Sequence, residues 1–350
     1  MARGFSEEVA RQVTRAICSS SSKVYEGKWN VYCKWCEGKE IDPVTADIHQ
    51  VADFLLFLFA ERKLSLSGIK GYRSALAKVL NYSTGTNISD SPVLSDLISA
   101  FEHQRPTCAS PLPKWDLNLV LEALSKDPYE PLSQASLKML TFKTVFLLTL
   151  AAGARCSEIH ALDVKHITHL QEWSTVKLAP HPKFLAKNFD YSQGGRNFEG
   201  FIIKALDSPA NSTSPRDVAL CPVRALRAYL NKTAPLRGDT TQLFISLVRK
   251  SPGPVRKNTV ASWLRQTVLL AYQDWKPGAA NDLRVSSHEV RAIATSTAFF
   301  HNVAMKDLLR TARWRHQSTF TSFYLRDVAE ELDGLKGLGP IMVAQNILHS

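Results

Sequence analysis

The sequence predicts a mainly α-helical protein with a small antiparallel β-sheet, in which a helical N-terminal domain precedes a mixed α+β domain. Apolar residues recur every three to four positions over most of the chain, which is the spacing of helices buried on one face. Two segments, 173–178 and 200–206, read as strands. At roughly 150 residues per domain, the 350 residues favour two domains.

The first hundred residues predict a helical bundle. We expect helices at 22–36, 48–61, 66–79 and 94–101. The first three follow side chains that can cap a helix, namely Ser21 or Ser22, Asp47, and Ser65 or Ser67. Pro106, Pro111 and Pro113 then lie within eight residues, which excludes a continuous helix. We therefore place the N-terminal domain at 1–105, a linker at 106–114 and the second domain at 115–350.

The second domain predicts more helices around the two strands. They are expected at 117–124, 137–150, 222–230, 262–272, 288–300 and 305–312. The helix over 137–150 is apolar enough to be buried, and the small residues Ala151, Ala152 and Gly153 predict a turn before a second short helix. The polar stretch between the strands suits a hairpin loop. The segment 328–350 predicts a helix, a break at Gly339-Pro340 and a last apolar stretch over 341–348.

Charge favours a polyanionic partner. The net charge is +11, and all of this excess lies between Arg216 and His316, where 17 Lys and Arg face 6 Asp and Glu. A basic block within a folded domain is typical of a surface that faces phosphates. Nucleic acid is therefore the favoured partner, ahead of an anionic membrane or a merely well-solvated surface.

Other features exclude several classes of protein. The longest apolar run, which begins at Phe54, is too short to span a bilayer, and the first residues do not resemble a secretory leader. The six cysteines are therefore expected to be reduced thiols in a cytoplasmic or nuclear protein. Cys33 and Cys36 form one C-x-x-C pair without a second pair at zinc spacing, so we expect no metal site. No nucleotide-binding loop is apparent, and no cofactor is expected.

Two arginine segments are candidates for binding a phosphate. Arg155 directly follows the turn at Gly153, where a rigid element could hold its guanidinium fork toward phosphate oxygens, and Glu158 lies one helical turn later, where it could orient Arg155. His288 and Arg291 lie on one face of the first turn of the helix over 288–300, behind a capping box formed by Ser286 and Glu289. A helix N-terminus also favours an anion.

A tyrosine and a set of lysines complete the candidates. Tyr324 follows the basic, aromatic segment ARWRHQSTFTSFY, and a tyrosine hydroxyl needs neighbouring cations and a base before it can act as a nucleophile. Lys177, Lys183 and Lys187 lie in the expected hairpin, from which a lysine could reach an active site as a proton donor. Each of these patterns also occurs in surface salt bridges and ordinary cores.

The complete order, Arg155, hairpin lysine, His288-x-x-Arg291, Trp314 and Tyr324, resembles the tyrosine recombinases (integrases). GARCSEIHAL is similar to the first arginine box of that family and SSHEVRA to its second. The segments VYCKWCEGKEIDP, CPVRALRAYL, STFTSFYLRDV and LGPIMVAQ are similar to recombinases of DIRS-type and Ngaro-type retrotransposons. The resemblance covers nearly the whole chain. It implies a SAM-like core-binding domain and a catalytic domain that clamp DNA between them.

The resemblance also implies a metal-independent reaction through a 3′-phosphotyrosyl intermediate. Tyr324 would be the nucleophile, Arg155 and Arg291 would hold the non-bridging oxygens, and His288 would act as general base and acid. Lys187 would protonate the 5′-oxygen, with Lys183 as the alternative. Trp314 would contact the phosphate, with His316 as the alternative because Trp314 lies one residue farther from Tyr324 than the family pattern.

The expected function is site-specific DNA recombination, for the integration of a mobile element. The expected partners are double-stranded DNA and further copies of the chain, as a dimer on one site and a tetramer in synapsis. By resemblance, 328–350 is a docking segment that would bind a neighbouring copy, and the alternative is that it folds back onto its own copy. A nuclear location is expected for a eukaryotic element and a cytoplasmic one otherwise. Two alternatives stay open, namely DNA relaxation of the type IB topoisomerase kind and a domesticated DNA-binding protein without catalysis.

Overall fold

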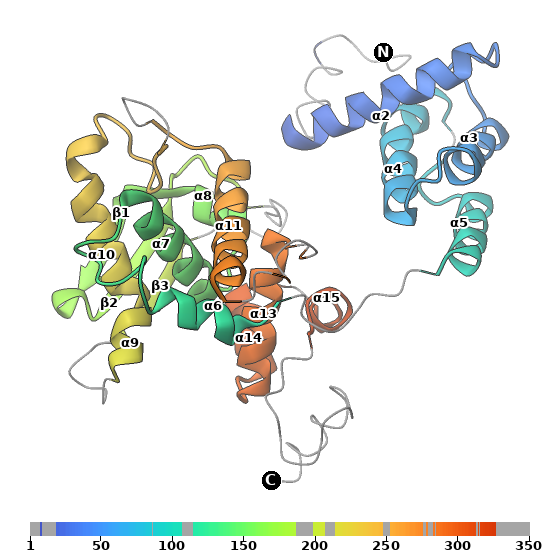
Figure 1. Ribbon diagram of the computed structural model, residues 1–350. Helices are drawn as coiled ribbons and strands as arrows, with labels where there is room; N and C mark the ends of the chain where they lie inside the picture. The colour runs from blue at the N-terminus through green and yellow to red at the C-terminus, as the bar shows by residue number, and fades with distance from the viewer. Residues whose placement is uncertain are drawn as a thin grey trace, which may run out of the picture. The chain divides into compact units, whose positions relative to one another are not determined.

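The computed structural model describes residues 8, 19–85, 87–106, 115–186, 199–206, 214–247, 253–275, 278, 283, 285–312, 314 and 316–326. The chain divides into two compact units, Met1–Ala109 and Ser110–Ser350 (Figure 1). Most of the expected linker and all of the expected docking segment 328–350 lie outside the described residues. Among the residues described, no helix is both long and apolar enough to cross a membrane.

The N-terminal unit is a bundle of four described helices, α2 (Ser19–Glu37), α3 (Ile48–Ala60), α4 (Leu66–Ser83) and α5 (Pro92–Gln104). Asp47 and Ser65 cap α3 and α4 as the sequence predicts. Helix α2 begins at Ser19, so Ser21 and Ser22 lie inside it and do not cap it. Serine is tolerated in a helix, and packing of the later apolar face outweighs its modest preference for a cap.

The sheet of the second unit has three antiparallel strands in the order β1 (Leu162–Leu170), β2 (Thr175–Pro180) and β3 (Phe201–Lys204). This confirms the predicted small antiparallel sheet, but β1 was not predicted. Its first residues are buried and its last three are exposed, so it lacks the even alternation that reveals a half-buried strand. Trp173 lies in the β1–β2 turn with a positive φ of 74°, not in the strand that the sequence predicts for it.

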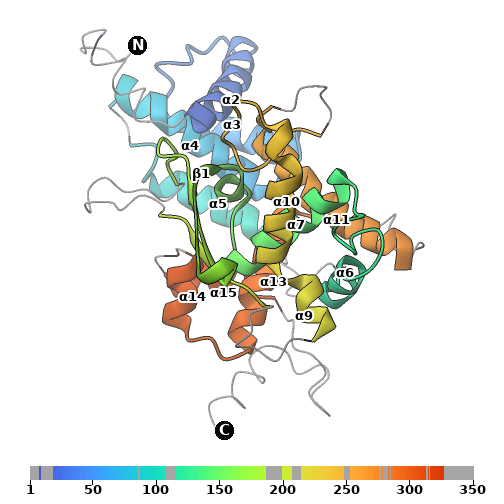
Figure 2. The ribbon, with the colours of Figure 1, turned by 90° about the vertical axis from the view of Figure 1, so that its left-hand side faces the viewer.

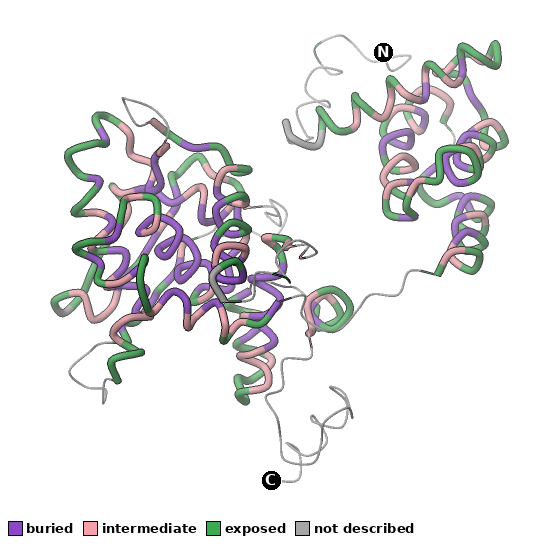
Figure 3. The backbone as a smooth tube through the Cα atoms, in the orientation of Figure 1, coloured by how far each residue is buried: buried purple, intermediate pink, exposed green. Residues whose placement is uncertain are grey.

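The helices of this unit pack around one central helix, and the sheet lies against this helical core. The described helices are α6 (Leu117–Leu124), α7 (Leu137–Ala152), α8 (Cys156–His160), α9 (Pro215–Leu220), α10 (Pro222–Thr233), α11 (Lys257–Trp275), α13 (Ser287–Phe300), α14 (Met305–Ala312) and α15 (Gln317–Phe323). Helix α7 contacts α10, α11, α13 and β3 and is buried along most of its length (Figures 1 and 3). Helices α14 and α15 lie together beside α13, at one end of this unit (Figure 2). The core therefore holds the ends of α7 and α13 in fixed positions.

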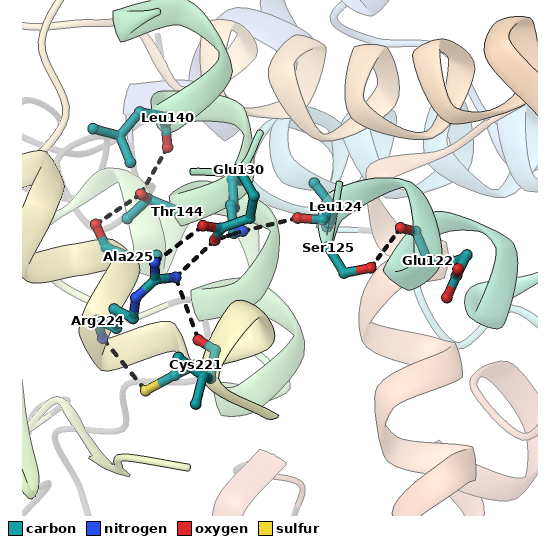
Figure 4. A network of polar contacts seen from close by, with 11 residues as sticks. Glu122, Leu124, Ser125, Glu130, Leu140, Thr144, Cys221, Arg224 and Ala225 are labelled. Carbon is teal, nitrogen blue, oxygen red and sulfur yellow. Dashed lines mark hydrogen bonds and ion pairs between the residues drawn. The ribbon is translucent and has the colours of Figure 1, made fainter. Parts of the chain in front are cut away.

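A buried ion cluster ties the segment after α6 to two helices. Lys143 lies in the middle of α7 with its side chain 0% exposed, and its ammonium group donates to the Leu124 carbonyl at 2.8 Å and to the Glu130 carboxylate. Arg224 of α10 donates to both oxygens of Glu130, at 2.7 and 3.0 Å (Figure 4). Burial raises the pKa of Glu130, but the hydrogen bonds from Arg224 and Lys143 outweigh it, so the pKa lies below its ordinary value of 4.5.

Glu130→Gln should therefore destabilise the second unit. The change keeps the shape of the side chain but leaves the Lys143 ammonium buried without its carboxylate, a loss that costs about 3–5 kcal/mol. Native-state hydrogen exchange of the α7 amides in the full chain would measure it. Because the pKa of Glu130 is lowered in the folded state, its contribution is complete above pH 4.5 and is lost as the pH falls through the folded value.

Glu122→Gln is the matched control for this prediction. It removes an exposed pair with Lys126, which contributes little to stability. Equal protection of the α7 amides in the two variants at pH 7 would show that the cluster does not stabilise the core. The difference in α7 amide protection between wild type and Glu130→Gln should also become smaller below pH 4.5.

Candidate active site

The site begins at the turn between α7 and α8. Gly153 is the C-cap residue of α7, and its φ of 52° and ψ of 37° are left-handed and thus favour glycine. Arg155 is the N-cap residue of α8, and its backbone N–H donates to Glu158 Oε2 at 2.8 Å. Its guanidinium donates to Glu158 Oε1 at 2.9 Å. The turn therefore places Arg155 at the edge of the core with Glu158 orienting it, as the sequence suggested.

Arg291 of α13 contacts this turn through a buried side chain. Its side chain is only 1% exposed. Nη1 donates to the Gly153 carbonyl at 2.8 Å and lies 3.7 Å from Glu158 Oε2, and Nη2 donates to the Ala312 carbonyl. Arg291 therefore joins the Gly153 turn to the end of α14, and Glu158 lies between two guanidinium groups.

Two aromatic rings cover the Arg291 guanidinium. Its Cζ lies 4.8 Å from the Trp314 ring centroid and 5.5 Å from that of Tyr324, and the two rings are 4.6 Å apart. These distances are typical of cation–π contacts. The Trp314 indole N–H is buried, with no hydrogen-bond partner in the described part of the chain. This geometry brings together residues that lie up to 169 positions apart in the sequence.

Trp314 and His316, the two alternatives for the residue that would contact the phosphate, differ in position. Trp314 is buried against Tyr324, whereas His316 is exposed at the N-cap of α15 and makes no side-chain cap there. Tyr324 is the C-cap residue of α15, where its backbone N–H donates to the Phe320 carbonyl at 2.9 Å. Trp314 is thus the residue that the fold places beside the tyrosine.

His288 lies where the sequence predicts, in the first turn of α13. Ser286 is the N-cap residue, and its hydroxyl accepts from the His288 backbone N–H at 3.3 Å. The His288 side chain is exposed, unlike that of Arg291. The carboxylate of Glu289, which we expected to complete the capping box, lies 3.9 Å from Arg326 Nε.

The hairpin lysines occupy different places. Lys177 is exposed on β2, and Lys183 is exposed just after it, where its backbone N–H donates to His181 Nδ1 at 3.2 Å. Lys187 lies outside the described residues. The choice between Lys183 and Lys187 therefore stays a prediction.

The cluster formed by Arg155, Glu158, Arg291, Trp314 and Tyr324 has the chemistry of an anion site. Two guanidinium groups share one carboxylate, which leaves an excess of positive charge beside a phenol. Cys156, next to Arg155, does not offer a competing thiolate because burial raises the pKa of its thiol. The cluster can therefore stabilise a phosphate next to the Tyr324 hydroxyl.

The contacts of two residues beside this cluster were not predictable from the sequence. Ser296 of α13 bonds to the backbone on both sides of Leu325, and Arg326 folds back onto the end of α15. A serine in a helix and an arginine after a tyrosine are both common, so neither was a signal by itself. Both depend on the packing of α15 against α13.

Comparison with known proteins supports the fold. No protein-family model and no curated protein sequence matches the chain. Among solved structures, a lambda integrase dimer bound to a core site matches 93% of this chain and 96% of its own, with 13% identity and a TM-score of 0.53. The Tn1549 transposon integrase in complex with transposon right end DNA matches 99% and 95%, with 12% identity and a TM-score of 0.53. The chain therefore has the fold of the tyrosine recombinases.

Proposed function

We propose that the protein is a site-specific DNA recombinase that cuts and rejoins DNA through a tyrosine. The observation that carries the proposal is the stacking of Tyr324 and Trp314 on the Arg291 guanidinium, with Glu158 between Arg291 and Arg155. Tyr324 thereby lies against one cation suited to phosphate oxygens, and Glu158 links this cation to a second, Arg155. The fold shared with recombinases and integrases bound to DNA supports the same conclusion.

The expected reaction follows from these groups. The Tyr324 oxygen attacks the phosphorus and loses its proton to His288, which can act as a base near neutral pH. Arg155 and Arg291 stabilise the charge that develops on the non-bridging oxygens. The bond to the 5′-oxygen breaks, and this oxygen takes a proton from Lys187 or Lys183. A 5′-hydroxyl of another strand then attacks the phosphotyrosine and gives its proton to the lysine, and the Tyr324 oxygen leaves with the proton held by His288.

A direct test works even when the sequence of the DNA site is unknown. The full chain is incubated with random-sequence duplexes that each carry one nick, so that a short fragment is lost after cleavage and the covalent complex is trapped. We expect protein–DNA complexes that resist denaturation, with the DNA attached at Tyr324. Attachment at another residue, or none, would contradict the proposal. Sequencing of the attached strands gives the preferred duplex.

Assembly and biological context extend this proposal. We place the protein in the integration of a mobile element of the DIRS or Ngaro type, acting as a dimer on one site and a tetramer on paired sites, in the nucleus if the element is eukaryotic. Strand exchange between two copies of the recovered duplex would support recombination. Relaxation of a supercoiled plasmid by a monomer, without exchange, would favour the topoisomerase alternative.

A substrate with sulfur at the 5′-bridging position should identify the acid. A thiolate leaves without protonation, so this substrate should restore the cleavage rate of Lys187→Ala if Lys187 is the proton donor. Lys183→Ala should then gain no more than wild type does. For both variants we would measure the rate of covalent attachment to the recovered duplex, with and without the 5′-bridging sulfur. The reverse pattern would assign the role to Lys183.

A further inference from the structure

The backbone around Tyr324 is tied to α13 by a single buried hydroxyl. Ser296 is 0% exposed. Its Oγ donates to the Tyr324 carbonyl at 3.1 Å and accepts from the Arg326 backbone N–H at 2.8 Å. Both groups lie at the end of α15, where a helix leaves its last carbonyls without partners inside the helix. The Ser296 hydroxyl thus pairs with the backbone carbonyl before Leu325 and with the backbone N–H after it.

The two bonds of Ser296 run to another part of the fold and not along its own helix. Serine and threonine inside a helix commonly bond to the carbonyl four residues earlier. Thr295 bonds to Arg291 O at 2.8 Å and Thr267 to Trp263 O at 2.9 Å in this way. Ser296 instead donates to a residue 28 positions later in the sequence. Its bond therefore joins two elements of the fold.

Arg326 also bonds to the backbone at the end of α15. Its Nη1 donates to the carbonyls of Phe323 at 3.3 Å and Leu325 at 3.0 Å. Its Nε lies 3.9 Å from Glu289 Oε1, and Glu289 is 4% exposed. Glu289 and Ser296 are seven residues apart, about two helical turns, so both lie on one face of α13. That face holds the backbone and the side chain of Arg326.

We propose that Ser296, Arg326 and Glu289 form a latch that positions Tyr324 for attack, a role that rests on the proposed function. The latch holds the backbone of Tyr324 to α13, the same helix that carries His288 and Arg291. The Tyr324 ring itself packs against Trp314 and Arg291. Because this ring packs against Arg291 and its backbone is held to α13, the Tyr324 hydroxyl stays close to the phosphate that Arg291 would bind.

Ser296→Ala tests the latch. The change removes both bonds of the hydroxyl and keeps the helix. A displacement of reacting atoms of about 1 Å can cost 10²-fold in rate, so we expect covalent attachment at saturating duplex to slow by about 10-fold to 10²-fold. The duplex concentration at half saturation should stay unchanged, because the fully buried Ser296 offers no surface to a ligand. The probe is the nicked duplex recovered with the wild-type protein.

Two further variants separate positioning from stability. Thr267→Val also removes one buried hydroxyl, in α11, and should attach DNA at the wild-type rate. Ser296→Thr keeps the hydroxyl but adds a methyl group at a fully buried site. It should be less stable than Ser296→Ala in thermal unfolding and yet attach DNA faster. A purely structural role predicts that rate follows stability in all three variants.

The outcomes distinguish the latch from the function on which it rests. A wild-type protein that forms no covalent complex would overturn the proposed function and the latch with it. Wild-type attachment with an equal rate in Ser296→Ala would overturn the latch alone. Faster attachment in Ser296→Ala would also overturn it, because the bonds would then hold Tyr324 back.

Discussion

Tyr324→Phe is expected to abolish covalent attachment to DNA. The variant lacks the only atom of this side chain that can attack phosphorus, but it keeps the ring that packs 4.6 Å from Trp314 and 5.5 Å from the Arg291 Cζ. The fold and the positive charge beside it should therefore be preserved. Attachment is measured as denaturation-resistant complexes on the recovered nicked duplex.

DNA affinity is the control for this variant. The dissociation constant on an intact copy of the same duplex should change little, because the proposed mechanism assigns the phosphate contacts to the arginines and not to the phenol. Phe323→Leu is a matched second variant, since Phe323 is 70% exposed on the same turn and is assigned no chemical role. Covalent complexes that persist in Tyr324→Phe would place the nucleophile at another residue.

Arg291→Ala is expected to lose both rate and stability. Loss of one preorganised group that stabilises transition-state charge slows an enzyme by about 10²-fold or more. The same change leaves the carbonyls of Gly153 and Ala312 without their buried donor, at about 1–3 kcal/mol each. Covalent attachment would measure the first effect, and hydrogen exchange of the α13 amides the second.

Arg155→Ala gives the matching contrast. Its side chain is 12% exposed and its guanidinium donates to Glu158, which keeps Arg291 at 3.7 Å after the change. The attachment rate should fall as in Arg291→Ala. The loss of hydrogen-exchange protection at the α13 amides should be much smaller. Arg291→Lys should recover part of the stability but not the full rate, since an ammonium group lacks the planar fork. Equal stability of the two alanine variants would contradict the buried role of Arg291.

Much of the fold was predictable because local patterns and tertiary packing agree. Helix α6 runs over the predicted residues 117–124, and Asp47 and Ser65 cap the helices that they were expected to cap. Strand β1 was missed because its burial does not alternate, and the start of α2 was misplaced because serine fits both a cap and a first turn. These differences arise where a residue type suits two local structures equally well.

The contacts of the ion cluster around Lys143 were also not predictable from the sequence alone. A lysine inside the apolar segment KTVFLLTL was visible in the sequence, and burial of a charge requires a partner. Which partner it would be was not visible, since Glu130 and Arg224 lie 13 and 81 residues away. The meeting of α7, α10 and the segment after α6 selects them.

The sequence by itself determined the fold class, the order of the candidate residues and the elements that carry them, because periodicity, caps and turns are local properties of the chain. The tertiary structure alone decided that Trp314 and not His316 lies against Tyr324, that Arg291 is buried whereas Arg155 reaches the surface, and that Ser296 holds the turn after Tyr324. The physical reason is that each of these contacts joins side chains from separate helices. Their distances depend on how α7, α13 and α15 pack, which no local pattern encodes.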